Sequence, residues 1–353
     1  MTAPLQSDAR NLSRRVPVAV LGATGYAGVE LLRLLSRHPG VEIDFLSSEQ
    51  YRERRASEVY PFLEGHVDQP LAAPDAWRQS RAELVFSALP HGASAPLVRD
   101  VLADGRRALD ISADFRLRDP TVYARWYGEH AAPELLDEAV YGLPELYRAS
   151  LPRARLVAVP GCYPTGALLG LVPLARAGLV REPVVIDSKS GTTGAGRGVK
   201  VEQLFAEVNE NFRPYAIGAH RHGPEIDQEL RRAGATAATI FVPHLLPVSR
   251  GIISTMYVAT SVGGAALGEL FERAYRGEPF IVLRGAQPPE LREVRGTNRC
   301  AIGWHWDEAT GRAVIVTAID NLGKGAAGQA IQCMNLLLGL PETTGLDAPA
   351  LVP

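Results

Sequence analysis

Cys162 lies where an apolar strand gives way to an apolar helix. Residues 155–159 have the pattern of a strand that ends at Pro160-Gly161, and the apolar residues over 167–175 predict a helix. A thiol at the start of a helix lies close to free backbone N–H groups, whose field favours the thiolate, the nucleophilic form of cysteine. We therefore expect Cys162 to be a nucleophile and Tyr163 beside it to contact the molecule under attack.

Two histidines, His220 and His222, flank Arg221 just before a helix that is expected over 224–232. Histidine is the side chain best suited to exchange protons near pH 7, so both are candidates for acid–base catalysis. We expect His220 to meet the thiol and the other histidine to bind an oxyanion, although the residue types alone do not decide between them. The pair lacks further ligands at a usable spacing for zinc, so no metal site is expected.

A glycine turn over 22–28 follows an apolar run over 16–21 and precedes helical spacing over 29–35. In such a unit the first glycine permits a tight turn, the second lets the backbone approach a pyrophosphate, and the third lets helix and strand pack closely. The helix N-terminus then faces the phosphates. We expect dinucleotide binding here, and the alternative is an ordinary glycine-rich turn. The expected contacts are Gly22, Thr24, Gly25, Tyr26 and Gly28.

The strand expected over 41–46 ends in Ser47 and Ser48, and Arg52 follows shortly. An NAD site usually carries Asp or Glu at this point, which bonds the ribose 2′-hydroxyl. Hydroxyls and a cation suit a 2′-phosphate instead, so we expect NADP(H) to be bound through these three residues. Glu49 argues against this choice, and the cation could instead belong to a solvated face.

Two further strands are expected, one leading to Ser87 and Pro90 and the other to Asp114 and Arg116. Ligands bind at the carboxyl ends of parallel strands, so Ser87 and Pro90 are expected to line the cofactor. Arg116 is expected to hold an anionic group of the substrate, because a guanidinium pairs planar oxyanions in a fork. A purely structural ion pair between Asp114 and Arg116 is the alternative.

Two loops beyond the cysteine carry further candidate contacts. The loop over 190–198 is rich in glycine and hydroxyl groups, exposes many N–H groups and can approach a ligand closely. We expect its Arg197 to bind substrate, and a surface loop without a ligand is the alternative. In the loop over 241–251, Arg250 is placed to take a carboxylate. The cofactor contacts expected in the first loop are Ser190, Gly191 and Gly194.

The chain is expected to return to the cofactor near its end. A strand expected over 313–319 leads into 320–329, a glycine-rich start to the last long helix. Asn321 in that segment suits a carboxamide or a phosphate. A final helix that packs on the first domain would make that domain discontinuous.

The whole chain must position these groups, and its composition limits the number of domains and the kinds of partner that are possible. With 353 residues, 46% hydrophobic and 22% charged, it is too long for one compact core, so two domains are expected. A net charge of −2 offers no basic footprint for nucleic acid, and no apolar run reaches the length of a membrane span. Three cysteines are too few and too scattered for a disulfide framework, and Cys300 and Cys333 fit buried apolar segments. A cytoplasmic location is expected.

The fold class that follows is α/β. Residues 16–160 and 320–353 are expected to form a Rossmann-like, NADP-binding domain, and 161–319 a mixed α/β domain for catalysis, substrate binding and dimerisation. Residues 1–15 are polar, lack an apolar signal core and are expected to be a flexible extension.

Taken together, the motifs resemble the N-acetyl-gamma-glutamyl-phosphate reductase family of arginine biosynthesis. The matching segments are GATGYAGVELLRLL, ISADFRL, PGCYPTG, SGTTGAGRG, HRHGPEI, FVPHLLPVSRGI and DNLGKGAAGQA. The resemblance implies an NADPH-dependent reduction of N-acetyl-glutamyl phosphate to the semialdehyde, with release of phosphate. It also implies Cys162 as the nucleophile, a histidine of HRH as the acid or base, and a homodimer or homotetramer.

Two other functions fit part of the same pattern. The aminoadipyl-phosphate reductases of lysine biosynthesis perform the same chemistry on a substrate held by an acidic carrier protein, which should favour a basic docking surface that the overall charge does not suggest. A non-catalytic NADP-binding sensor could keep the fold, because a fold does not fix a function. Resemblance to aspartate-semialdehyde dehydrogenase stops at the motifs that the superfamily shares.

Overall fold

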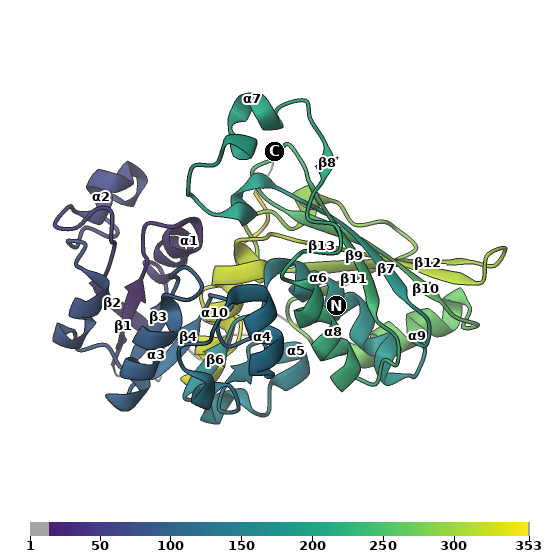
Figure 1. Ribbon diagram of the computed structural model, residues 1–353, viewed down its shortest axis with the longest axis horizontal. Coiled ribbons are helices and arrows are strands. Elements are labelled where there is room, and N and C mark those ends of the chain that lie inside the picture. The colour runs from purple at the N-terminus through teal and green to yellow at the C-terminus, as the bar shows by residue number, and fades with distance from the viewer. Residues whose placement is uncertain (1–13, 352–353) are drawn as a thin grey trace, which may run out of the picture.

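The first sheet is built from six parallel strands in the order β2-β1-β3-β4-β6-β5 (Figure 1). The computed structural model describes residues 14–351, so all but the last two residues of the expected N-terminal extension lie outside the described residues. The strands are β1 (Val16–Leu21), β2 (Val41–Leu46), β3 (Leu84–Ser87), β4 (Arg107–Asp110), β5 (Val140–Tyr141) and β6 (Leu156–Ala158).

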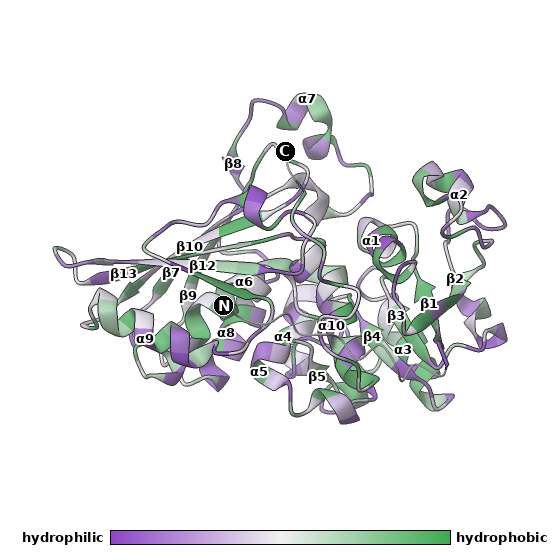
Figure 2. Cartoon of the chain, turned by 180° about the vertical axis from the view of Figure 1, so that it is seen from behind, coloured by the Kyte–Doolittle hydropathy of each residue, from purple (hydrophilic) through white to green (hydrophobic). Residues whose placement is uncertain are grey.

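Helices cover both faces of this sheet, because strands β1, β3 and β6 inside it are mostly apolar and buried, as parallel strands covered on both sides must be. One face packs with α1 and α10 in a core that includes Leu31 and Ile331, and the other packs with α3 around Trp77. Figure 2 shows β1 and β3 as apolar segments. The helices of this part are α1 (Tyr26–Leu35), α2 (Ala56–Val59), α3 (Ser94–Ala103), α4 (Pro120–Tyr127), α5 (Pro144–Tyr147) and α10 (Gly328–Leu337).

The second sheet is mixed, with seven strands in the order β11-β12-β13-β10-β7-β9-β8. In β7 and β10 buried and partly exposed residues alternate, so one face is buried and the other is open. Helices α6, α8 and α9 lie on the buried side (Figure 1). The strands are β7 (Val184–Ser190), β8 (Arg213–Pro214), β9 (Thr239–Leu245), β10 (Ile252–Ala259), β11 (Ile281–Gly285), β12 (Cys300–Asp307) and β13 (Arg312–Ile319). The helices are α6 (Cys162–Arg176), α7 (Phe205–Val208), α8 (Gly223–Arg232) and α9 (Gly264–Ala274).

The expected α/β class, with a Rossmann-like sheet and a second mixed sheet, is confirmed. The last helix does return to the first sheet, since Ile331, Met334 and Leu337 of α10 share a core with β1. The domain boundaries expected at 160 and 320 stay a prediction. Within residues 14–351, no helix combines the length and apolar character that crossing a membrane requires.

Two helices begin earlier than the apolar pattern indicates. Helix α1 begins at Tyr26 and α6 at Cys162 itself, so each starts directly at the turn that was expected to carry the chemistry. The start of the last helix also differs, because 323–327 form a π-helical turn before α10 begins. A π-helical turn is rare and often occurs at functional sites.

Candidate active site

Cys162 lies in the wall of a cavity of about 760 Å³ that is lined from both sheets. It is the first residue of α6, and Gly161 before it is the N-cap. The cavity collects eleven of the expected site residues: Tyr26, Pro90, Arg116, Cys162, Tyr163, Ser190, Gly191, Gly194, His220, His222 and Asn321. The fold therefore brings the nucleotide turn, the thiol and both histidines to the same cavity.

Neighbouring segments of the chain fix the position of Cys162. The Gly161 N–H donates to Glu225 Oε1 at 2.9 Å, and a Cβ placed on Gly325 would lie 2.8 Å from Cys162 Cβ. Burial raises the pKa of the Cys162 thiol to about 11, while the Arg116 guanidinium and the Tyr163 N–H lower it by less. The expected helix N-terminus is present, but in the free chain desolvation outweighs it and the thiol stays protonated.

This balance predicts how Cys162 reacts with an alkylating reagent. Below its pKa the thiolate fraction rises about tenfold per pH unit, so the rate of iodoacetamide modification should rise about tenfold per unit from pH 7 to pH 10. Mass spectrometry of the modified peptide gives the rate at each pH. A rate that levels off near pH 7 would show instead that the helix N-terminus dominates.

The two histidines lie together, with ring centroids 4.9 Å apart. His220 Nδ1 accepts the His222 N–H at 3.1 Å, and His222 Nε2 lies 3.5 Å from Arg116 Nη1. Because a guanidinium can only donate, His222 Nε2 must be the acceptor, so the ring proton is on Nδ1. Burial lowers the pKa of His220 to about 4 and that of His222 well below its usual value. Both rings are therefore neutral at pH 7.

The Arg116 side chain is fixed by several acceptors and is only 8% exposed. Its Nε donates to Val159 O and its Nη2 to Ile111 O, both at 2.8 Å, and Nη1 lies 3.6 Å from Glu225 Oε2. The alternative pair with Asp114 does not form, because the Asp114 carboxylate accepts backbone N–H groups and the Tyr123 hydroxyl instead. Nη1 thus lies between Glu225 and His222 at the cavity wall, where its positive charge can attract an anion.

The glycine turn has the close contacts that its spacing predicts. Gly22 has a φ of +79°, and a Cβ on it would lie 2.6 Å from Ala88 O. Ser47 Oγ accepts the Gly22 N–H at 3.1 Å, and Ser48 Oγ lies 2.7 Å from Thr24 Oγ1. The two serines thus hold the turn in shape, which fits their expected place beside the cofactor.

Ten expected residues are not part of the cavity lining: six in or beside the glycine turn (Gly22, Thr24, Gly25, Gly28, Ser47 and Ser48), and Arg52, Ser87, Arg197 and Arg250. Arg52 pairs with Glu49 at the surface, and Ser87 Oγ lies 2.6 Å from Ser94 Oγ. Arg197 reaches the glycine turn, where its Nη1 donates to Thr24 O at 3.2 Å. Arg197 therefore lies nearer to the expected cofactor site than to Cys162.

Arg250 was expected to take a carboxylate of the substrate, but the chain itself supplies its carboxylates. Its Nη2 lies 2.7 Å from Glu30 Oε2, and its Nη1 lies 3.5 Å from Asp320 Oδ2. The guanidinium is therefore neutralised between α1 and the end of β13. A role for Arg250 in holding those two segments together fits this geometry better than direct contact with substrate.

Asn321 and Tyr163 lie in the cavity as expected and are well anchored. Asn321 Oδ1 accepts the Gly251 N–H at 2.7 Å, and its Nδ2 donates to Thr193 Oγ1 at 2.9 Å. The hydroxyls of Tyr163 and Tyr215 lie 2.9 Å apart. Both side chains are thus held by loops of the second sheet.

Several residues in or behind the cavity wall were not predicted from the sequence. Glu225, which holds both Gly161 and Arg116, lies in the HRHGPEI segment but has no chemical pattern of its own. The segment over 199–217 also reaches the cavity, although only scattered charges mark it in the sequence. The charged residues that line the cavity are four cations and one carboxylate: Arg116, Lys200, Arg213, Arg221 and Glu202. This excess of positive charge suits anionic ligands. Among residues 14–351, no group of three or more His, Cys, Asp or Glu side chains could hold a metal ion.

Comparison with known proteins agrees with this geometry. Residues 17–154 match the family model described as semialdehyde dehydrogenase, NAD binding domain, and 162–321 match semialdehyde dehydrogenase, dimerisation domain. Among solved structures, aspartate semialdehyde dehydrogenase II from Vibrio cholerae, complexed with ASA, has a TM-score of 0.72 at 19% identity, covering 93% of this chain and 99% of that one. The same enzyme type from Candida albicans, solved with NADP, has a TM-score of 0.65 at 15% identity, covering 92% and 99%. These structures are alike in fold.

Closer relatives match along nearly the whole sequence. N-acetyl-gamma-glutamyl-phosphate reductase from Pelotomaculum thermopropionicum is 49% identical over 347 residues, which is 96% of this chain and 99% of the relative. The protein of the same name from Halorhodospira halophila is 50% identical over 343 residues, 96% of this chain and 100% of the relative. The chain therefore belongs to the N-acetyl-gamma-glutamyl-phosphate reductase family, within the semialdehyde dehydrogenases.

Proposed function

We propose that this chain is an NADPH-dependent reductase that converts N-acetyl-L-glutamyl 5-phosphate to N-acetyl-L-glutamate 5-semialdehyde and phosphate in arginine biosynthesis. The observation that carries the proposal is the cavity, which brings a thiol, a buried arginine and two neutral imidazoles to the edge of a dinucleotide-binding turn. The family to which the chain belongs supports the choice of substrate.

The residues at the nucleotide end fit NADPH. A Cβ on Gly28 would lie 2.2 Å from Gly22 O, so only glycine allows α1 to begin so close to the turn. The first turn of α1 carries no acidic residue that would repel phosphates. The Ser48 hydroxyl and the Arg197 guanidinium both contact Thr24 of the glycine turn, so a hydroxyl and a cation are available there for a 2′-phosphate, while Arg52 is paired with Glu49. When bound, NADPH supplies the hydride.

The acyl-transfer step follows from the groups around the sulfur. His222 is the better placed base, because a Cβ on Gly161, the residue before the thiol, would lie 2.5 Å from its Nε2. As His222 takes the thiol proton, sulfur bonds to the acyl carbon, the carbon–oxygen bond to phosphate breaks, and phosphate leaves a thioester on Cys162. The raised pKa of the thiol makes such a neighbouring base necessary.

The start of α6 and Arg116 stabilise the charge that develops on the acyl oxygen. The backbone N–H groups of Cys162 and Tyr163 point at the reacting region, and each such donor is typically worth about 3–4 kcal/mol in a transition state. After reduction of the thioester, His220 is placed to exchange a proton as the aldehyde leaves, since its accepting Nδ1 leaves Nε2 to carry the proton.

The reverse reaction tests the function directly. Purified protein is incubated with N-acetyl-glutamate semialdehyde, phosphate and NADP, and the appearance of NADPH is followed by absorbance. We expect phosphate-dependent turnover, and parallel assays with NAD and with aspartate semialdehyde should be much slower. Activity only with a carrier-bound aminoadipate semialdehyde would move the chain to the lysine pathway. If the protein binds NADP but shows no turnover, the alternative of a non-catalytic NADP-binding sensor would be favoured.

We also propose that two copies of the chain associate through the open face of the second sheet, as a homodimer or as half of a homotetramer. Apolar side chains form a row across this face, because Tyr257 pairs with Val185 on one side and Val314 on the other, and Val185 pairs with Ile240. Ile240 is 52% exposed, so the row is left open to solvent. The match to a dimerisation domain over 162–321 supports association through this part of the chain. The cytoplasmic location stays a prediction.

Charge placed in this row should dissociate the oligomer. In the double variant Tyr257→Lys/Val314→Lys, two cations would be buried against the same patch of the partner, which costs several kcal/mol per ion. Sedimentation or light scattering should then show the monomer. The control is Phe62→Lys, at a residue of similar exposure beside the first sheet, which should leave the mass unchanged. An unchanged mass in the double variant would place the interface elsewhere.

A further inference from the structure

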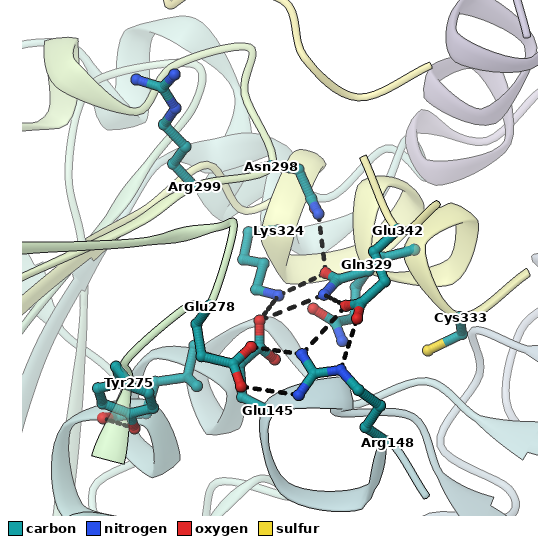
Figure 3. Close-up of polar contacts among 12 residues, drawn as sticks. Glu145, Arg148, Tyr275, Glu278, Asn298, Arg299, Lys324, Gln329, Cys333 and Glu342 are labelled. Atoms are coloured by element: carbon teal, nitrogen blue, oxygen red, sulfur yellow. Dashed lines mark hydrogen bonds and ion pairs between the residues drawn. The ribbon is translucent and has the colours of Figure 1, made fainter. Parts of the chain in front are cut away.

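Lys324 is a fully buried cation that the proposed mechanism does not use (Figure 3). It lies in the π-helical turn Gly323–Ala327, and its Nζ donates to Glu145 Oε1 at 2.6 Å and to Gln332 Oε1 at 2.7 Å. Its Nζ also lies 5.6 Å from the centre of the Phe280 ring. The Glu145 side chain is likewise fully buried, so neither charge is solvated by bulk water.

The pair belongs to a larger, partly buried polar cluster that joins three parts of the chain. Arg148, which follows α5, pairs with Glu278 near β11 and with Glu342 beyond α10. Gln332 connects the two groups, because its Nε2 donates to Glu342 Oε2 at 3.0 Å. Figure 3 shows Arg148 between the two carboxylates, with Lys324 and Glu145 pointing at one another beside it. The π-helical turn is thus fixed from one side by charge.

The other side of the same turn forms part of the active-site wall. Leu322, Gly325 and Ala326 line the cavity, and a Cβ on Gly325 would lie 2.8 Å from Cys162 Cβ and 3.2 Å from its Cα. The turn therefore packs directly on the nucleophile, one residue along from the buried cation. A shift of the turn by a fraction of an ångström would therefore displace the Cys162 sulfur.

Stability alone is a poor account of this ion pair. Taking two charges out of water costs several kcal/mol each, and replacing such a pair by uncharged side chains of similar volume is often neutral or stabilising. Glu145 Oε2 has no hydrogen-bond partner among the described residues, so the pair is not fully satisfied. What the pair does supply is position, because the hydrogen bonds of Lys324 to Glu145 and Gln332 hold the turn in its present arrangement.

We propose that Lys324 and Glu145 are positioning residues for the reaction, which hold the π-helical turn against Cys162. The turn in turn keeps the sulfur packed and directed into the cavity. The claim about catalysis depends on the proposed function, whereas the claim about the thiol can be tested without any substrate.

The test is the double variant Lys324→Met/Glu145→Gln, which removes both charges and keeps both shapes. The expected result is a folded protein in which turnover falls at least about tenfold, as expected when reacting groups lose alignment, with little change in the KM for NADPH. The pH at which iodoacetamide modification of Cys162 is half-maximal should fall, because a loosened turn admits water. The matched control is Arg148→Met, which breaks the rest of the cluster without touching the turn and should leave both measurements unchanged.

Each other outcome has a defined meaning. Modification of Cys162 with the wild-type pH profile and normal turnover would overturn the proposal. So would failure of the double variant to fold, since the pair would then serve stability. Peptide mapping separates local from global loosening: only Cys162 should be modified, whereas unfolding would also expose Cys300 and Cys333, which are both fully buried. If the wild-type chain lacked the proposed activity, the change in the thiol profile would still stand.

Discussion

Replacing Cys162 by serine is expected to reduce turnover by about 10⁴-fold or more, because the thioester can no longer form and a serine hydroxyl is a much weaker acid and nucleophile than a thiol beside the same histidine. NADPH affinity should not change, since the cofactor turn lies on the other side of the cavity. Steady-state assays of the reductase and fluorescence titration with NADPH give the two quantities. The smaller oxygen atom should leave the fold intact.

A matched control comes from a second cysteine of the same chain. Cys300 in β12 is fully buried and does not line the cavity, so Cys300→Ser should retain turnover and lose only some stability. Turnover in Cys162→Ser above about a hundredth of the wild-type rate, or an equal loss in both variants, would contradict a covalent role for Cys162.

The glycine turn offers a second large effect, in which substitutions at Gly25 and Gly28 separate folding from cofactor binding. In Gly28→Ala the new Cβ would lie 2.2 Å from Gly22 O and 2.8 Å from Ala23 C, both backbone atoms that cannot move freely. Alanine gains about 1 kcal/mol over glycine inside a helix, but overpacking of this kind costs about 1–3 kcal/mol or more, so the clash wins. We expect Gly28→Ala to lose stability and NADPH binding together.

Gly25→Ala is the matched variant, because alanine fits both the backbone conformation and the space at this position. Its new Cβ would lie 3.7 Å from Gly22 O, a normal contact, and Gly25 has a φ of −75° that alanine adopts readily. The melting temperature should therefore stay unchanged, while NADPH affinity falls because the methyl group takes the space by which the backbone approaches the pyrophosphate. Calorimetric melting and NADPH titration of both variants provide the measurements. Unchanged NADPH affinity in Gly25→Ala would show that the phosphates of the cofactor do not bind beside this residue.

The sequence was informative wherever function depends on a short segment. The place of Cys162 at a strand–helix junction, the glycine turn and Asn321 all reflect local geometry that fixed spacings encode, and the structure brings them to one cavity. Charged side chains were harder to place. Arg197 and Arg250 were assigned to substrate from their loops, but a long side chain reaches whichever partner the tertiary fold supplies, here the glycine turn and Glu30.

Other features depend on contacts between distant segments and leave no local pattern. Glu225 acts through Gly161, which lies 64 residues away. The pKa of Cys162 is raised because the folded chain buries it, and a helix N-terminus read from the sequence says nothing of that burial. The π-helical turn gives no periodic signal either, because its course is set by Asp320, whose carboxylate accepts the Leu322 and Gly323 N–H groups.

The return of α10 to the first sheet has a consequence for how the protein is made. The core on one face of that sheet joins Leu31 and Val20, near the beginning of the chain, to Ile331, Met334 and Leu346, near its end. A ribosome releases the chain from its N-terminus, so most of the nucleotide-binding sheet emerges first but keeps an apolar face uncovered until α10 has been synthesised. Such exposed surface favours aggregation and recruits chaperones. We expect the second sheet to fold first and a nascent chain stopped before α10 to remain bound to a chaperone.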